Sequence, residues 1–292
     1  MSPGLTVVIL TFNEARHIAR AIASVQGLAT RIVVVDSDST DDTVAIAAAN
    51  GAEVLVNPWI NYATQFNWAL DNAGIDTDWT LRLDADEIIE PGLAAALRTF
   101  LGAPGDAAGA TVDRRIDFLG RAIRWGGVYP VRQLRLWRSG RGRCESRWMD
   151  EHITVDGPIA HLSGGDLADV NLNNLGWWTA KHNGYATREA IDELLRAPVD
   201  AEVGGQAGVK RWIKHKVYHR LPLGSRALAY FIYRYVLRLG FLDGWPGLVF
   251  HALQGGWYRF LVDAKIAEIR GLMRARGASL AQVVADEYGH RI

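Results

Sequence analysis

The N-terminal part of the chain alternates between short apolar runs and segments with helical signals, and this order restricts the possible folds more than any other feature. The apolar runs are rich in β-branched residues, which is typical of strands buried on both faces of a sheet. Strands are expected at 6–12, 31–36, 53–56 and 79–84, and helices between them at 15–25, 39–50 and 61–73. This alternation predicts an α/β fold of the Rossmann type, with a mostly parallel sheet flanked by helices.

Polar side chains occur at the points where these strands should end. The residues expected there are Thr11, Asn13, Asp36, Asp38, Asp84 and Asp86. Ligands of such sheets bind beyond the carboxyl ends of the strands, so the set outlines a pocket. Asp36 could accept hydrogen bonds from a nucleobase or a ribose, although Asp36 or Asp38 taken alone is more typical of a turn or a helix cap. A dinucleotide site is disfavoured because no G-x-G-x-x-G follows the first strand.

Asp84 and Asp86 have the clearest chemical implication. One small residue separates them, so on a strand both side chains point the same way. At the strand end they can share one divalent ion, Mg²⁺ or Mn²⁺, and its bound phosphate oxygens. The alternative is a solvated acidic turn before a helix that begins at Pro91. The pattern alone leaves both interpretations open.

A basic and aromatic segment occupies part of the last third of the chain. The formal net charge at pH 7 is zero, yet no acid lies between Glu202 and Asp243. The basic residues in between are Lys210, Arg211, Lys214, Lys216, Arg220, Arg226, Arg234 and Arg238. Interleaved with Trp, Tyr and Phe, they predict peripheral contact with an anionic membrane through residues 210–240. The alternative is that these helices pack on the α/β domain and their arginines are solvated.

Other features bear on size and compartment. The chain has 292 residues, of which 49% are hydrophobic, enough for one large domain or one domain with an appendage. The single cysteine, Cys144, cannot form an internal disulfide, which favours a reducing compartment. The N-terminus lacks the basic region of a secretion signal, and basic residues interrupt the apolar stretches near the C-terminus. We therefore expect a cytoplasmic protein, at the inner face of the cytoplasmic membrane.

A strand with three arginines is expected in the middle of the chain. Alternation at 131–138 predicts the strand, with Arg132, Arg135 and Arg138 on one face. These side chains would form either an anion-binding stripe or a row of exposed arginines on an edge strand.

The region after this strand has weaker signals. GGDLAD at 164–169 is expected to be a loop, and a helix is expected from Asn173 to Leu195. Trp177, near the start of that helix, would be either a core residue or a platform on which a sugar stacks.

Three segments resemble a known family when taken in order. TVVILTFNEARHI begins at Thr6, IVVVDSDSTDDT at Ile32 and LRLDADE at Leu81. Together they resemble the N-terminal half of the inverting nucleotide-sugar glycosyltransferases with the GT-A fold, and more narrowly the lipopolysaccharide-core glucosyltransferase type. The resemblance covers nearly the whole chain, including DEHITVDG at 150–157 and NLNNLGWWTAKHNGYA at 171–186.

The resemblance implies a donor site. By it, the nucleotide pocket would be lined by Thr11, Asn13, Glu14, Asp36 and Asp38, with Gln65 and Asn67 near the sugar diphosphate. Asp84 and Asp86 would hold the ribose and the metal-bridged diphosphate. Mg²⁺ or Mn²⁺ is the expected cofactor, a UDP-sugar is the expected donor, and no nucleic acid is expected as a partner.

The resemblance also implies a catalytic base and an acceptor side. Glu151 is the expected base, and the adjacent Asp150 remains an alternative, because neighbouring side chains of an extended segment face opposite ways. His152 could support either carboxylate or approach the metal. Arg132, His152 and Trp177 are expected on the acceptor side.

The expected activity is the transfer of a single hexose to a lipopolysaccharide-core or other surface-glycan precursor. Processive synthases of this superfamily carry Gln-x-x-Arg-Trp, whereas this chain has QLRLW at 133–137. A GT-A-like domain is expected at 1–165 and a helical region at 166–292. The alternatives are a nucleotide-sugar-binding module without catalysis and a phosphatase of the haloacid-dehalogenase type. The phosphatase is disfavoured because its Asp-x-Asp normally follows the first strand of the chain.

Overall fold

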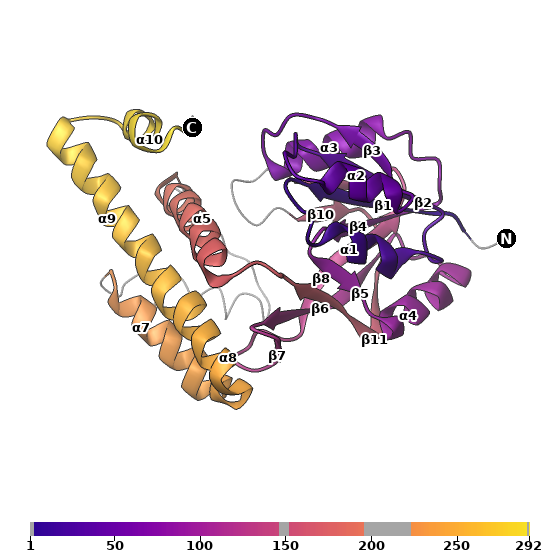
Figure 1. Cartoon of the computed structure of the whole chain (residues 1–292). Coiled ribbons are helices and arrows are strands. Elements are labelled where there is room, and N and C mark those ends of the chain that lie inside the picture. Colours follow the sequence, from indigo (N-terminus) through magenta and orange to yellow (C-terminus); the bar gives the residue numbers. More distant parts are fainter. Residues whose placement is uncertain (1–2, 146–151, 196–222, 291) are drawn as a thin grey trace. The chain divides into compact units, whose positions relative to one another are not determined.

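The computed structural model describes residues 3–145, 152–195, 223–290 and 292, which form two compact units (Figure 1). The first unit comprises the described residues up to Arg124 together with Val128–Leu172. The second comprises Trp125–Gly127 and the described residues from Asn173 onward. The division lies after the expected domain boundary at 165, because the last strand of the first unit continues to Val170.

The N-terminal strands of the first unit form a parallel sheet. They are β1 (Leu5–Thr11), β2 (Arg31–Asp36), β3 (Glu53–Val56) and β4 (Trp79–Asp84), in the order β3-β2-β1-β4. The helices between them are α1 (Ile18–Val25), α2 (Thr43–Ala49) and α3 (Tyr62–Asn72). The predicted α/β alternation is confirmed.

The side chains of β1 show why these apolar runs form buried strands. Val7 and Ile9 point to one face, where they share a core with Ile18 of α1. Val8 points to the other face and packs in a second core with Phe66 of α3. Each such buried side chain stabilises the fold by roughly 1.5–3 kcal/mol. A strand that buries both of its faces is apolar at nearly every position, as this run is apart from Thr6 and Thr11.

The sheet becomes mixed beyond β4. Its further strands are β5 (Glu87–Ile89), β6 (Gly109–Phe118), β7 (Arg121–Ile123), β8 (Val131–Arg138) and β11 (Ile159–Val170). β8 runs antiparallel to both β4 and β6, β11 runs parallel to β6, and β5 runs antiparallel to β11. A helix, α4 (Pro91–Gly102), follows β5, and β9 (Gly142–Cys144) pairs with β10 (Ile153–Val155) in a separate small sheet. The parallel arrangement is thus confined to the first four strands and to the β6/β11 pair.

The GGDLAD segment belongs to β11, so its prediction as a loop was wrong. The register of β11 against β6 shifts between Leu162 and Asp166, which marks a bulge. A Cβ atom at Gly165 would lie 2.2 Å from the backbone nitrogen of Leu93, at the start of α4. The glycines therefore allow α4 to approach the strand closely, although in the sequence they are typical of a loop.

The second unit is helical. Its elements are α5 (Leu175–Leu195), α7 (Ser225–Ile232), the π-helix η2 (Tyr233–Leu237), the 3₁₀-helix η3 (Gly240–Asp243), α8 (Gly244–Phe250), the π-helix η4 (His251–Trp257), α9 (Tyr258–Arg276) and α10 (Leu280–Tyr288). Its core joins α5, α9 and α10 through residues such as Ala190, Ile266 and Val283. The expected helix from 173 to 195 is confirmed. Among the residues that the structure describes, no helix is long and apolar enough to span a bilayer.

Candidate active site

The loops that follow β1 and β2 are fixed to each other by hydrogen bonds. Thr11 Oγ1 donates to Asp36 Oδ1 at 2.8 Å, and the backbone nitrogen and hydroxyl of Ser39 donate to the same carboxylate at 2.7 and 2.6 Å. Asp36 is buried. Its oxygens therefore order these loops.

Asn13 and Glu14 complete the connection between the two loops. Asn13 Oδ1 accepts from the backbone nitrogen of Thr40 at 2.8 Å, and the Glu14 nitrogen donates to Thr43 Oγ1 at 2.7 Å. Asn13 and Asp38 both have left-handed backbone conformations, with φ of 55° and 59°. Asn and Asp tolerate this region better than most residues, and such conformations are concentrated in binding loops.

Gln65 and Asn67 of α3 are engaged with the protein itself. The Gln65 side chain is buried and bonds Ser37 Oγ at 3.0 Å and the backbone oxygen of Asn57 at 2.8 Å. Asn67 bonds both backbone groups of Cys144 in β9, at 2.8 and 3.0 Å. These amides attach the neighbouring loops to α3, and their predicted place near the sugar diphosphate stays a prediction.

Asp84, the last residue of β4, is held by three side chains. Tyr62 donates its hydroxyl to Oδ1 at 3.1 Å and Arg82 Nε donates to the same oxygen at 3.2 Å. Arg135 Nη2 donates to Oδ2 at 3.1 Å. Burial opposes ionisation, but the guanidiniums of Arg135 and Arg82 outweigh it and hold the pKa of Asp84 well below its usual range. The carboxylate is thus ionised and oriented while 30% of its side chain remains exposed.

A buried ion cluster lies beside this carboxylate. Glu87 Oε1 accepts from Arg135 Nη2 at 2.6 Å and from Arg114 Nε at 3.2 Å, and Glu87 Oε2 accepts from the Asp84 nitrogen at 3.0 Å. Glu87 is fully buried and Arg135 nearly so. Removing one partner of such a cluster leaves an uncompensated buried charge, which is strongly destabilising. The cluster therefore fixes the turn that carries both acids.

Both interpretations of the three arginines on β8 were wrong, because β8 lies between β4 and β6 and is not an edge strand, and the three side chains form no common stripe. The register of β8 against β6 shifts so that Arg135 has no partner across the ladder, and it points into the ion cluster. Arg132 is exposed, with Nε 3.7 Å from Asp113 Oδ1. The Arg138 guanidinium lies over the Trp79 ring, 4.8 Å from its centre. The three arginines thus have three different environments, and they do not form one anion-binding surface.

Asp86 differs from Asp84 in having a carboxylate oxygen, Oδ1, with no hydrogen-bond partner among the residues that the structure describes. Its Oδ2 accepts from Asn171 Nδ2 at 3.0 Å, while its backbone oxygen accepts from the nitrogen of Val170 at 3.0 Å. Within residues 3–145, 152–195 and 223–292, apart from residue 291, no group of three or more His, Cys, Asp or Glu could hold a metal ion. A single carboxylate fits a cation that takes its other ligands from phosphate and water, as Mg²⁺ commonly does.

The electrostatics around Asp86 also fit a cation. Asp169 of β11 pairs with Arg114. Burial raises the pKa of Asp169 to about 7 despite that guanidinium, and the like charges of Asp86 and Glu87 add to the rise. Crowded carboxylates of this kind repel one another, and a divalent cation would relieve the repulsion.

The roles predicted for residues in catalysis and acceptor binding are not tested by the described structure. Asp150 and Glu151 lie outside the described residues. His152 is exposed, with Nδ1 3.3 Å from Glu145 Oε1. Trp177 belongs to the second unit, where the Lys181 ammonium lies 4.6 Å from its ring centre. The acceptor roles of Arg132, His152 and Trp177 stay predictions.

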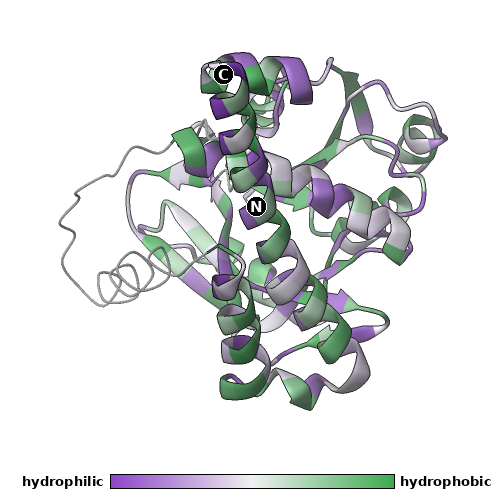
Figure 2. Cartoon of the chain, turned by 90° about the vertical axis from the view of Figure 1, so that its left-hand side faces the viewer, coloured by the Kyte–Doolittle hydropathy of each residue, from purple (hydrophilic) through white to green (hydrophobic). Residues whose placement is uncertain are grey.

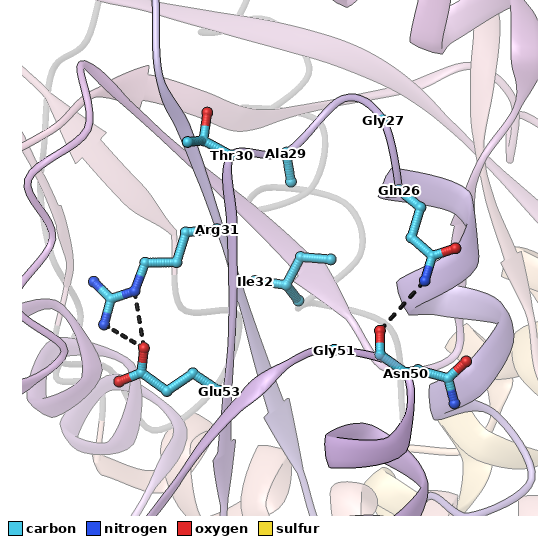
Figure 3. A pocket seen from close by; sticks show the side chains of 9 residues that line it. All are labelled: Gln26, Gly27, Ala29, Thr30, Arg31, Ile32, Asn50, Gly51 and Glu53. Carbon is cyan, nitrogen blue, oxygen red and sulfur yellow. Dashed lines mark hydrogen bonds and ion pairs between the residues drawn. The ribbon is translucent and has the colours of Figure 1, made fainter.

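A depression of the first unit lies at the other end of the sheet, and Figure 3 shows the residues that line it. It has a volume of about 390 Å³ and is lined by residues at the amino ends of β2 and β3. Two of the lining residues, Arg31 and Glu53, form an ion pair with 2.6 Å between Nη2 and Oε2. Ligands of parallel sheets bind at the carboxyl ends, so this depression is not the expected substrate site.

Comparison with known proteins identifies relatives over the full chain. The model of the family described as "Glycosyl transferase family 2" matches residues 6–149. A lipopolysaccharide core biosynthesis glycosyltransferase, LpsC of Rhizobium meliloti, is 30% identical over 93% of this chain and 94% of its own length. An uncharacterized glycosyltransferase of Rickettsia felis is 49% identical over 28% of this chain, and the chain covers only 29% of that protein.

The similarity to solved structures covers less than half of this chain. Glucosyl-3-phosphoglycerate synthase from Mycobacterium tuberculosis, in complex with Mn²⁺, UDP and phosphoglyceric acid, is 25% identical with a TM-score of 0.33. The match covers 38% of this chain and 43% of that chain, less than half of its length. A second structure of that synthase, with phosphoglyceric acid alone, matches at 23% identity with a TM-score of 0.33, over 39% of this chain and 44% of that one.

Proposed function

Because the chain belongs to glycosyl transferase family 2, we propose that it transfers a single hexose from a UDP-sugar, with inversion, to a lipopolysaccharide-core or related surface-glycan precursor. The observation that carries this proposal is the placement of Asp84 and Asp86 at the carboxyl end of β4. The Asp84 carboxylate is oriented by Arg82 and Arg135, and Asp86 Oδ1 has no hydrogen-bond partner in the described part of the chain. The acceptor class follows from the full-length similarity to LpsC.

In this proposal each acid has its own task. Asp86 holds Mg²⁺ or Mn²⁺, which would neutralise charge on the departing diphosphate. Asp84 is held by Tyr62, Arg82 and Arg135 and orients the ribose side of the donor. Glu151, or Asp150 in its place, removes the proton of the acceptor hydroxyl as it attacks the anomeric carbon. The two loops that Asp36 and Asn13 fix together would line the nucleotide pocket.

Calorimetric titration with nucleoside diphosphates tests the donor class. UDP with Mn²⁺ is expected to bind more tightly than GDP or ADP with Mn²⁺, and a panel of UDP-hexoses should then give metal-dependent transfer or slow hydrolysis of one of them. Tighter binding of a different nucleotide would overturn the UDP assignment. Binding without any transfer to lipopolysaccharide-core acceptors would favour the non-catalytic module, and turnover of phosphate monoesters would favour the phosphatase.

We further propose that the second unit contacts a membrane, mainly through apolar side chains. Leu228, Leu237 and Trp245 are 61%, 68% and 71% exposed. Figure 2 shows hydrophobic stretches along the helices of this unit. Shallow insertion of such side chains into a bilayer surface is favourable in proportion to the apolar area buried.

The arginines contribute less to this surface than their sequence suggests. Arg226 is buried and pairs with Asp263, and Arg234 is buried with Nε donating to the backbone oxygen of Gly126 at 3.1 Å. Residues 210–222 of the predicted membrane segment lie outside the described residues. Within the described part, the expectation of a surface lined by arginines was therefore wrong for Arg226 and Arg234.

Co-sedimentation with phosphatidylglycerol vesicles at low ionic strength tests the membrane contact. The wild-type protein is expected to pellet, and the double variant Leu237→Ser, Trp245→Ser should bind roughly tenfold or more weakly, because burial of each apolar side chain would contribute roughly 1.5–3 kcal/mol. Trp59→Ser, at an exposed tryptophan of the first unit, is the matched control. Equal pelleting of all three proteins, or none by the wild type, would contradict the proposal.

A further inference from the structure

The end of β11 is attached to the start of α1 by a buried histidine. His17 Nε2 accepts from the backbone nitrogen of Leu172 at 2.9 Å, and His17 Nδ1 lies 2.5 Å from Glu14 Oε2. Since the Leu172 amide can only donate, Nε2 carries no proton and Nδ1 donates to Glu14. A residue of the predicted nucleotide pocket is thus connected through His17 to the chain that follows β11.

Arg20 makes a second attachment between the same two elements. Its Nη2 donates to the backbone oxygen of Val170 and, at 3.4 Å, to the backbone oxygen of Asp86. The Nε atom of Arg20 is buried and has no hydrogen-bond partner among the described residues. A buried donor without a partner is unfavourable for folding, so stability alone does not account for an arginine here.

Asp86 therefore accepts hydrogen bonds from three residues. Its backbone oxygen accepts from Arg20 and from the Val170 nitrogen, and its Oδ2 accepts from Asn171 Nδ2 at 3.0 Å. These contacts fix both the backbone and the side-chain rotamer of Asp86. They leave Oδ1 as the atom of Asp86 without a hydrogen-bond partner in the described part of the chain.

We propose that Arg20 and Asn171 are positioning residues of the metal site, which act by holding Asp86. This inference rests on the proposed function, because it requires Asp86 to bind the cation. Outer residues that orient a metal ligand commonly change metal affinity by 10- to 100-fold when they are replaced. Arg20 reaches Asp86 from α1 and Asn171 reaches it from beyond β11, so the position of the ligand depends on elements far apart in sequence.

The test measures Mn²⁺ affinity by electron paramagnetic resonance of the free ion, with UDP at saturation. Asn171→Ala and Arg20→Gln are expected to weaken Mn²⁺ binding by roughly 10- to 100-fold, and Arg20→Lys should restore part of the loss because it keeps a charged donor. Arg31→Gln is the matched control, since Arg31 also donates to a backbone oxygen, that of Gly74 at 2.9 Å, but at the other end of the sheet. Its Mn²⁺ affinity should equal that of the wild type.

Two outcomes separate this inference from the proposed function. If Asp86→Ala abolishes Mn²⁺ binding while Asn171→Ala and Arg20→Gln bind the ion as tightly as the wild type, the positioning role is overturned and the metal site stands. If Asp86→Ala binds Mn²⁺ normally, the metal assignment itself is overturned and the positioning role falls with it. Asn171 is only half-buried and lies just past the end of a strand, so its alanine variant tests the positioning role even if Arg20→Gln folds poorly.

Discussion

Asp86→Ala is expected to abolish sugar transfer while leaving the fold intact. In the proposed function, a cation held by Asp86 would lower the barrier by several kcal/mol by neutralising charge on the leaving diphosphate, so loss of the cation should cost roughly 10³-fold or more in rate. Among the described residues, the side chain of Asp86 accepts one hydrogen bond, from Asn171, and forms none with the buried ion cluster. We therefore expect the melting temperature of the variant to stay close to that of the wild type.

Asp84 supplies the contrast to this variant. Its carboxylate accepts bonds from Tyr62, Arg82 and Arg135, so Asp84→Asn should lower both activity and melting temperature. Asp71→Ala, at an exposed ion pair with Arg143, controls for the loss of any carboxylate. Full activity of Asp86→Ala, or of the wild-type enzyme in excess chelator, would rule out the metal role.

The elements that the sequence predicts well are those whose burial pattern is local. β1 is apolar at nearly every position because both of its faces are covered, and the same is true of the core of β2. The ends of these strands are marked by Asn13 and Asp36, which suit turns. Strand, helix and the carboxyl-end cluster could therefore be derived from neighbouring residues alone.

The partners of the site acids depend on pairings between distant segments. Arg135 reaches Asp84 and Glu87 only because β8 is shifted in register against β6 at that residue, which regular alternation cannot anticipate. Asn171, the partner of Asp86, comes from the chain directly after β11. Arg82 is different: it lies two residues before Asp84 on the same strand, so alternation already placed it on the same face. It could have been named from the sequence.

Two side chains predicted to lie near the sugar diphosphate, Gln65 and Asn67, form hydrogen bonds with other residues of the chain. Gln65 makes hydrogen bonds with Asn57, and Asn67 makes two with the backbone of Cys144 in β9. A sequence shows that an amide stands near the end of a strand, but the amide's partner is decided by the tertiary structure. Loops held this rigidly bind a ligand with less loss of conformational entropy, so such residues can matter to the donor site without touching it.

The described residues on either side of the expected base are attached to α3 and to each other. Asn67 of α3 bonds the backbone of Cys144 in β9, and β9 pairs with β10, which begins directly after His152. The backbone oxygen of His152 accepts a hydrogen bond from the Glu145 nitrogen at 3.0 Å, which extends the β9/β10 pairing by one bond. The segment that contains Asp150 and Glu151 is thus bounded by residues attached to the helix that flanks β4, although both carboxylates lie outside the described residues.

Glu151→Gln is therefore expected to lower the transfer rate by roughly 10² to 10⁴ while donor binding stays nearly unchanged. An inverting transfer is a single displacement, so the acceptor hydroxyl must lose its proton as it attacks, and glutamine keeps the shape of the side chain without accepting that proton. Asp150→Asn is the matched variant, because adjacent side chains of an extended segment face opposite ways and one carboxylate should suffice. Rates are compared at saturating donor, and UDP affinity is measured for both variants. An inactive Asp150 variant beside an active Glu151 variant would assign the base to Asp150, and two active variants would place the base elsewhere in the chain.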